Sequence, residues 1–376
     1  MKTRRRRRRR ITAKFVIILV LFIIALTLGI LVLSNSGSDN DNIVPGETQK
    51  PGLIDSIFSK TPEPTETPEP EPTETPEPTP TPLPEFSPYA IEGTRPSDFG
   101  METAIEVNGE IVSSYQREQT IDFGEGRDYT QLEGIITFRG NNFRDNPAYG
   151  TATIVEKTLD DANAWIVNTG SVPKVYGSGA WTGSGWTGQP LIVRWPEETK
   201  RIMNLYDSAK NKTDLVEVIY ATMDGHIYFL DLDTGERTRD PINMGRYPFK
   251  GAGALDPRGY PLMYLGSGDD SKDDGEGSSH ASIISLIDGK VLYEFGSKDS
   301  FSLRGKLSYF DSSALVDAET DTLIYPGENG ILYMIKLNTN YDVNAGSISV
   351  APEVVKWRYK GSRNNSTATV DGTKGR

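Results

Sequence analysis

Three patterns of hydrophobic and polar residues follow one another along the chain. The first is an apolar run from Phe15 to Leu33, whose 19 residues (33 − 15 + 1) contain no charged side chain. A helix of this length crosses a hydrocarbon core of about 30 Å, because each residue adds about 1.5 Å. We therefore predict a transmembrane helix over residues 15–33.

The residues before the apolar run are basic, and this asymmetry predicts the orientation of the chain. Lys2, Arg4–Arg10 and Lys14 precede the run, whereas residues 34–41 carry only Asp39 and Asp41. The positive-inside rule places residues 1–14 in the cytosol and the rest of the chain outside the cell. Arg4–Arg10 lie so close to the predicted span that we expect them to bind anionic lipid headgroups.

A cleaved signal peptide is the alternative interpretation of this segment. Signal peptides usually have an apolar region of about 7–15 residues that ends at an Ala-x-Ala-like site. The run here is longer, and Ser-Asn-Ser-Gly-Ser-Asp follows it. We favour a retained anchor in a single-pass membrane protein.

The second pattern is polar and rich in proline, threonine and glutamate, over residues 34–85. Residues 61–84 read TPEPTETPEPEPTETPEPTPTPLP, in which frequent prolines fix φ and remove backbone donors. Such a segment cannot pack a core, and we predict a disordered stalk in an extended polyproline-II conformation. Its 24 residues (84 − 61 + 1) would reach roughly 75 Å. The alternative is a filler whose length has no function.

The third pattern, from Phe86 onward, consists of short β-branched and aromatic runs separated by turns. Asn108-Gly109 lies between two such runs and predicts a hairpin. No long helical period occurs after the predicted span. We predict an all-β fold, with a β collar segment over residues 86–162 and repeats over residues 163–376.

The repeats have a fixed spacing. The segment 218–233 matches the segment 323–338 without a gap, at an offset of 105 residues (330 − 225). A degenerate copy, Pro261–Gly266 and Ala281–Gly289, lies between them around a polar insertion. In the two clear copies one strand ends at Asp224-Gly225 or Asn329-Gly330, a pair that favours a tight hairpin turn.

Units of four antiparallel strands at about 40–50 residue spacing are typical of β-propeller blades. We count about three blades, and residues 364–370 would open a fourth. Propellers close with about 4–8 blades. We expect a truncated sequence, and the alternative is a ring that another chain completes.

The segment Asp224–Glu236 resembles the pyrroloquinoline-quinone-like (PQQ-like) propeller repeat, with its Asp-Gly turn, Leu-Asp strand and Thr-Gly turn. That repeat commonly continues to a tryptophan, and Trp165 and Trp357 lie in such contexts. Glu133–Asp145 resembles a collar found before such propellers in membrane-anchored proteins of clostridia and their relatives. The resemblance covers about residues 163–376 and implies a fold more than an activity.

Composition excludes several classes of function. Beyond the nine cations of residues 1–14, the chain has 31 basic and 52 acidic residues (40 − 9 = 31; 31 − 52 = −21), so we expect no nucleic-acid binding through phosphate contacts. The absence of cysteine excludes disulfides and thiolate metal sites. For a chain that faces an oxidising exterior, it also favours a bacterial surface.

The resemblance raises the possibility of a quinoprotein enzyme that holds PQQ and calcium. Such enzymes often use a disulfide between adjacent cysteines, and no residue here matches their calcium ligands or catalytic aspartate. G-x-S-x-G and Walker A sequences are also absent. We therefore predict neither cofactor and no catalytic residue.

Two weak site candidates remain. Five carboxylates in one loop could form a calcium site, although Lys272 occupies a ligand position and we favour a solvated insertion: Asp269, Asp270, Asp273, Asp274 and Glu276. Trp181 and Trp186 could stack on a sugar ring, and packing between blades is the favoured alternative. They flank Gly183–Gly188, a G-x-G-x-x-G sequence that we expect to form a turn before a strand.

The favoured function is a non-catalytic binding or scaffold module at the cell surface. A repeat scaffold without recognisable catalytic chemistry supports it, and the partner would be a cell-wall polymer or a surface protein. The alternative is an enzyme, either a quinoprotein or a polysaccharide-cleaving propeller in which two carboxylates act as acid and base.

Overall fold

The computed structural model describes residues 91–95, 98, 101–156, 158, 164–185, 187–271, 273–304 and 308–360. All of these residues belong to the second of the two units into which the chain divides, residues 85–376. The predicted cytosolic head, transmembrane helix and stalk lie outside the described residues, as does the predicted start of a fourth blade at residues 364–370. In the described part of the chain, no helix is long and apolar enough to cross a membrane.

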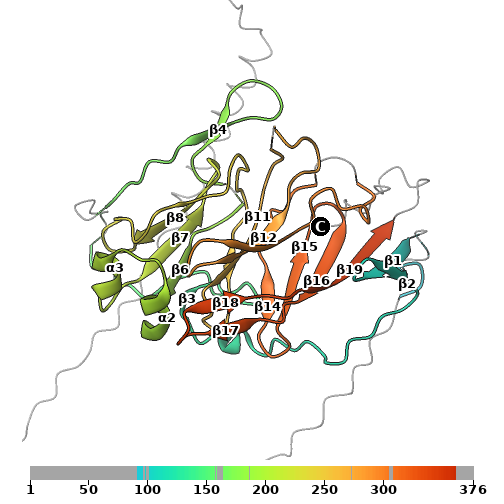
Figure 1. Cartoon of the computed structure of the whole chain (residues 1–376), viewed down its shortest axis with the longest axis horizontal. Helices are drawn as coiled ribbons and strands as arrows, with labels where there is room; N and C mark the ends of the chain where they lie inside the picture. Colours follow the sequence, from blue (N-terminus) through green and yellow to red (C-terminus); the bar gives the residue numbers. More distant parts are fainter. Residues whose placement is uncertain are drawn as a thin grey trace, which may run out of the picture. The chain divides into compact units, whose positions relative to one another are not determined.

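The described part of residues 85–376 is mostly β, and three antiparallel sheets form its body (Figure 1). The five-stranded sheet has the order β3-β6-β7-β8-β9. Its strands are β3 (Glu133–Ile135), β6 (Leu191–Arg194), β7 (Glu217–Ala221), β8 (His226–Asp231) and β9 (Ile242–Asn243). The four-stranded sheet has the order β10-β11-β12-β13. Its strands are β10 (Ala254–Leu255), β11 (Leu262–Gly266), β12 (Ala281–Ser285) and β13 (Val291–Phe295).

The six-stranded sheet has the order β14-β15-β16-β19-β1-β2. Its strands are β14 (Leu315–Asp317), β15 (Thr322–Pro326), β16 (Ile331–Lys336), β19 (Glu353–Lys360), β1 (Glu102–Val107) and β2 (Glu110–Val112). Two small hairpins pair β4 (Ser171–Pro173) with β5 (Ala180–Thr182) and β17 (Asn340–Asp342) with β18 (Ser347–Ser349). The short helices are α2 (Glu197–Ile202), α3 (Asp207–Asn211) and the 3-10 helix η2 (Gly126–Asp128).

Each large sheet contains one antiparallel meander in chain order. These meanders are β6 to β9, β10 to β13, and β14-β15-β16-β19, and they confirm the prediction of a mostly β chain with antiparallel units. Strands from residues 86–162 extend two of the sheets, because β1 pairs with β19 and β3 pairs with β6. The hairpin predicted at Asn108-Gly109 is confirmed as the β1–β2 pair.

The 105-residue repeat extends to individual hydrogen bonds. Tyr228 Oη donates to Asp224 Oδ2 over 2.7 Å, and Asn329 Nδ2 donates to Tyr333 Oη over the same distance. Gly225 and Gly330 both have positive φ, 78° and 82°, in the tight turns that join the paired strands. The local turn chemistry therefore folds both copies in the same way.

The degenerate middle copy shares one backbone hydrogen bond with the two clear copies. The backbone N–H groups of Leu232, Leu286 and Leu337 each donate to a carbonyl that precedes the second strand of its meander. The acceptors are Val216, Pro261 and Asp321, at 3.0, 2.8 and 2.9 Å. The polar insertion joins β11 to β12, as the sequence predicts. All three meanders are thus copies of one unit.

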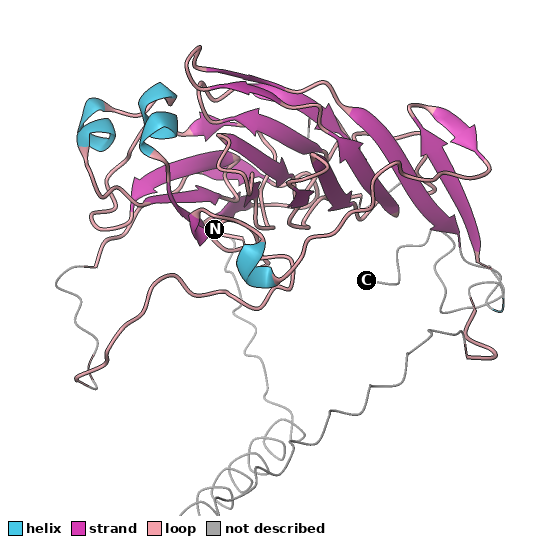
Figure 2. Ribbon diagram, turned by 90° about the horizontal axis from the view of Figure 1, so that it is seen from below, coloured by secondary structure: helices cyan, strands magenta, loops and turns pink. Residues whose placement is uncertain are grey.

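The three sheets are stacked face against face (Figure 2). We define the forward face of the five-stranded sheet as the side that carries Ile219, Ala221, Ile227 and Phe229. The rear face is the side that carries Val218, Tyr228 and Leu230. The forward face packs on Met263, Leu265 and Ile284 of the four-stranded sheet, which form the rear face of that sheet. The next interface repeats this arrangement. The forward face of the four-stranded sheet (Leu262, Tyr264, Ala281, Ile283) packs on the rear face of the six-stranded sheet (Leu323, Tyr325, Ile331, Tyr333, Ile335).

A buried ion pair joins the first two sheets. The side chains of Arg239 and Glu217 are 1% and 0% exposed, and Arg239 Nη2 lies 2.6 Å from Glu217 Oε2. Arg239 Nη1 also donates to the carbonyl of Leu286 over 2.7 Å. Trp195 donates its indole N–H to the same carboxylate over 2.9 Å. These bonds satisfy polar groups that would otherwise be costly to bury.

The segment Glu133–Asp145 contacts the first strand of the meander, or the residue just before that strand, in all three sheets. The backbone N–H of Leu255 in β10 donates to the carbonyl of Ile136 over 2.7 Å. Thr137 Oγ1 donates to the carbonyl of Ala314, just before β14, over 2.8 Å. Arg144 Nη2 donates to the carbonyl of Ser313 over 3.0 Å. This segment therefore fixes the relative positions of the sheets.

Candidate binding site

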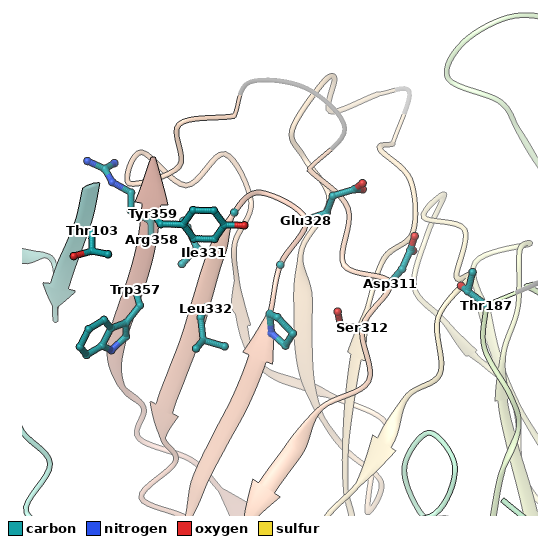
Figure 3. A pocket seen from close by; sticks show the side chains of 13 residues that line it. Thr103, Thr187, Asp311, Ser312, Glu328, Ile331, Leu332, Trp357, Arg358 and Tyr359 are labelled. Carbon is teal, nitrogen blue, oxygen red and sulfur yellow. The ribbon is translucent and has the colours of Figure 1, made fainter. Parts of the chain in front are cut away.

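The forward face of the six-stranded sheet carries a pocket of about 740 Å³ (Figure 3). Its apolar end includes Pro326, Leu332, Trp357 and Tyr359 from β15, β16 and β19. Its polar end includes Thr187, Asp311, Ser312 and Glu328 from loops. A pocket of this size with few polar groups has the usual character of a binding site.

The register of the strands explains why the apolar side chains meet. Successive side chains of a strand point to opposite faces, so residues directly paired across strands share a face. Pro326 pairs with Leu332, and Leu332 pairs with Trp357. Thr103 of β1 pairs with Tyr359 at the next step along β19. The side chains on one face of β15, β16 and β19 thereby build one apolar surface.

This face is more exposed than its equivalents inside the stack. Leu332 is 37% exposed, whereas Ile227, its repeat equivalent 105 residues earlier, is 0% exposed. The indole N–H of Trp357 is buried and has no hydrogen-bond partner among the described residues. A buried N–H without a partner is unfavourable. The face therefore presents apolar area to an incoming molecule.

Charged groups surround the polar end of the pocket. Lys250 Nζ lies 3.6 Å from Asp311 Oδ2 and 4.5 Å from the ring centre of Tyr309. Burial, followed by the nearby charge of Asp269, raises the pKa of Tyr309 far above its ordinary value, so its hydroxyl stays protonated. These groups can bind polar parts of a ligand through hydrogen bonds and charge.

The acidic loop considered as a calcium site directs its side chains to separate partners. Asp273 lies 3.4 Å from Arg246 Nη1, and Asp270 Oδ1 accepts the N–H of Ser279 over 3.0 Å. Tyr247 donates to Asp274, and a hydrogen bond to Glu276 raises the pKa of Tyr176 to about 12. Asp269 Oδ1 accepts the backbone N–H of the next residue over 2.8 Å. Over the described ranges, which omit Lys272, no group of three or more His, Asp or Glu residues could hold a metal ion.

The tryptophan candidates for sugar stacking lie away from this pocket or outside the described residues. Trp181 belongs to β5, and Lys174 Nζ lies 4.3 Å from the centre of its ring. Trp186 is outside the described residues. The G-x-G-x-x-G sequence leads into strand β6, as predicted, and Gly183 has a positive φ of 76°.

Sequence reasoning did not single out Leu332, Tyr359, Asp311 or Glu328 as site residues. Trp357 was noted only as a repeat position. The sequence does indicate part of this site, because the 105-residue offset makes Leu332 the repeat equivalent of Ile227 and Pro326 the repeat equivalent of Ala221. The loop residues Asp311 and Glu328 have no such signal, because only the tertiary fold brings them to the pocket.

Comparisons with known proteins give little further information. No protein-family model and no curated protein matches this chain. A quinohemoprotein alcohol dehydrogenase from Pseudomonas putida HK5 has a partly similar structure, with a TM-score of 0.26 and 11% sequence identity. The match covers 42% of this chain and 31% of the dehydrogenase chain. The chain thus spans about a third of the length of that structure, and the similarity is partial.

Proposed function

We propose that this chain is a non-catalytic binding module at the cell surface, built as blades of a PQQ-like β-propeller and held by a membrane anchor. Three copies of one four-stranded meander, stacked in the same sense, support the propeller interpretation. The apolar run at residues 15–33 and the basic residues before it support the anchor and its orientation.

The forward face of the six-stranded sheet is the observation that carries the proposal. It joins aliphatic and aromatic side chains around a pocket of about 740 Å³. Protein interfaces are enriched in aromatic residues and methionine and depleted of charge at their centre, and this face includes Leu332, Met334 and Trp357. A sugar ring would require more hydrogen-bonding groups around the aromatic side chains. We therefore favour a surface protein over a wall polymer as the partner.

The binding function is tested by site-specific photocrosslinking in intact cells. A photoreactive phenylalanine analogue replaces Leu332, which is 37% exposed, or Val291 as a control, which is 40% exposed and lies on β13. We expect a protein adduct of defined mass at Leu332 and none at Val291. An adduct with wall polymer would refute the choice of partner. Equal or absent labelling at both positions would refute the binding site.

The catalytic alternative needs a separate assay on the purified full-length chain. PQQ and calcium are added, and dye reduction is followed with alcohols and sugars as substrates. The proposal predicts no turnover above the rate of PQQ alone. Substrate-dependent turnover that is lost when the protein is heat-denatured would replace the binding proposal with a quinoprotein activity.

A further inference from the structure

The three meanders each place a polar residue at the same position. Thr187, Lys250 and Asp311 stand four residues before the first strand of their meander, which is β6, β10 or β14 (191 − 187 = 254 − 250 = 315 − 311 = 4). Thr187 Oγ1 donates to the carbonyl of Lys250 over 2.9 Å, and Lys250 Nζ lies 3.6 Å from Asp311 Oδ2. These three residues therefore form one row across the three meanders, which we call the polar row.

Glycine allows the loops of the polar row to approach closely. Gly188 follows Thr187, and a Cβ there would lie 2.6 Å from the carbonyl oxygen of Gly251. Gly251 follows Lys250, and a Cβ there would lie 2.2 Å from the carbonyl oxygen of Asp311. Backbones that come this close require a residue without a Cβ. Backbone contact thus explains the glycines, but it does not determine which side chain precedes them.

Two tyrosines and the acidic loop lie beside the polar row. Lys250 Nζ is 4.5 Å from the ring centre of Tyr309, and the Tyr309 hydroxyl donates to the carboxylate of Asp269. Tyr176, in the loop between β4 and β5, is 55% exposed. Its pKa is raised to about 12, first by a hydrogen bond to Glu276, then by burial and by nearby carboxylates that include Asp269. The β4–β5 hairpin and the acidic loop therefore converge on the polar row.

The charges gathered here are buried at a cost in free energy. Lys250, Asp269 and Asp270 are 9%, 8% and 2% exposed. Charged groups are expensive to remove from water even when they are paired. The first copy has Thr187 where the second has Lys250, so a meander of this kind folds without a charge at this position. Buried charges with shifted pKa values beside them are typical of functional sites.

We propose that the polar row, together with Tyr176, binds a neutral saccharide. Thr187 and Lys250 donate hydrogen bonds to sugar hydroxyls, and the carboxylate of Asp311 accepts them. The exposed ring of Tyr176 packs against the apolar face of the sugar. Thr187 and Asp311 lie at the polar end of the pocket (Figure 3), so the sugar does not use the apolar surface around Leu332. The saccharide is a second ligand, in addition to the protein partner proposed above.

The balance of charge distinguishes a saccharide from an ion. The ammonium of Lys250 lies among four carboxylates, those of Asp269, Asp270, Asp311 and Glu276. These carboxylates would repel an anion, and Lys250 would repel a cation. Within the described ranges, no group of three or more His, Cys, Asp or Glu residues could hold a metal ion. Sugar hydroxyls carry no charge and both donate and accept hydrogen bonds, which matches the mixture of donors and acceptors.

Isothermal titration of the full-length chain in detergent tests the site with neutral tetrasaccharides of glucose, mannose and N-acetylglucosamine. We expect one of these probes to bind, and Tyr176→Ala to weaken its binding by about tenfold through the loss of an aromatic contact. Tyr206→Ala is the matched control and should leave binding unchanged. Tyr206 is also an exposed tyrosine, at 39%, and it donates to the carboxylate of Asp240 next to α3.

Lys250→Met tests the polar row itself, because methionine keeps the aliphatic volume of lysine but cannot donate. We expect saccharide binding to fall below detection, whereas Lys290→Met, at a lysine that is 75% exposed, should bind normally. Circular dichroism checks that both variants are folded. If Lys250→Met does not fold, the comparison of Tyr176→Ala with Tyr206→Ala decides alone, because Tyr176 is exposed.

Salt separates a neutral ligand from a charged one. Binding of a neutral saccharide should stay constant between about 0.05 and 0.5 M sodium chloride, because screening acts on charges. A steep fall with salt would overturn the choice of a neutral ligand. Failure of all three probes, or equal binding by Tyr176→Ala and Tyr206→Ala, would overturn the saccharide site. If the photoreactive residue at position 332 still labels a protein in that case, the proposed binding function stands and only the saccharide site fails.

Discussion

Replacing Arg239 with methionine tests whether the buried ion pair holds the first two sheets together. The side chains of Arg239 and Glu217 are 1% and 0% exposed, and they make contacts at 2.6 and 3.1 Å. Methionine keeps much of the aliphatic volume of arginine but removes its charge. Glu217 would then keep its bonds to Thr238 and Trp195 but lose its only cation among the described residues.

The magnitude follows from the burial of the remaining carboxylate. Removing one partner of a buried pair costs about 3–5 kcal/mol, because the other charge stays buried without compensation. The variant also loses the hydrogen bond to the Leu286 carbonyl of the next sheet. At about 2–4 °C per kcal/mol for domains of 150–250 residues, we expect the melting temperature to fall by roughly 6–20 °C.

The assay is thermal unfolding followed by circular dichroism, with Arg246→Met as the matched control. Arg246 lies 3.4 Å from Asp273, and the two side chains are 53% and 64% exposed. An exposed pair contributes about 0–1 kcal/mol, so the control should melt close to the unmodified chain. If Arg239→Met shifts the melting temperature no more than Arg246→Met does, the buried pair does not contribute as argued.

Three further predictions use simpler changes. Gly225→Ala should destabilise the fold at least twice as much as Gly109→Ala in urea unfolding; both have positive φ, but a Cβ at Gly225 would lie 2.2 Å from the Gly245 carbonyl oxygen. Stability should fall as pH rises from about 10 to about 12. Burial raises the pKa of Tyr129 and Tyr247 to about 12 in the folded chain, so in this pH range the folded chain keeps protons that the unfolded chain releases. Measurements of the melting temperature and of tyrosinate absorbance against pH check this prediction. The melting temperature should be the same in the presence of calcium as in the presence of a chelator. A higher melting temperature in calcium would support the acidic loop as a metal site.

The sequence predicts the parts of the fold that depend on neighbouring residues. Asp224-Gly225 and Asn329-Gly330 specify tight turns through their own backbone preferences, and the strands beside them are runs of aliphatic and aromatic residues. The middle copy is degenerate in sequence but retains its short apolar strands. The hairpins therefore follow from local rules.

Pairings between distant segments do not follow from local rules. Ile105 of β1 pairs with Trp357 of β19, and Gly134 of β3 pairs with Val193 of β6. Turn chemistry and periodicity contain no information on which edge a separate strand joins. These pairings depend on which sheet edges remain free after the meanders form.

The same reasoning explains the outcome for the site. Alternation along β16 shows that Leu332 and Met334 share a face, but it does not show whether another sheet covers that face. Trp181 was chosen for its residue type, and the structure places it on a separate hairpin. The acidic loop was chosen for its composition, whereas the fold gives its carboxylates different partners.

The pairing of β1 with β19 also has a mechanical consequence. Tension on the chain before Glu102 reaches the described fold first through the ladder that pairs Glu102 with Lys360 and Val107 with Val355. If a pull strips β1 from the sheet, Trp357 loses its neighbour Ile105 and the edge of β19 becomes free to pair. A load carried by the segment that precedes this strand would then change which edge of the six-stranded sheet is open to pairing, so the proposed binding would depend on force.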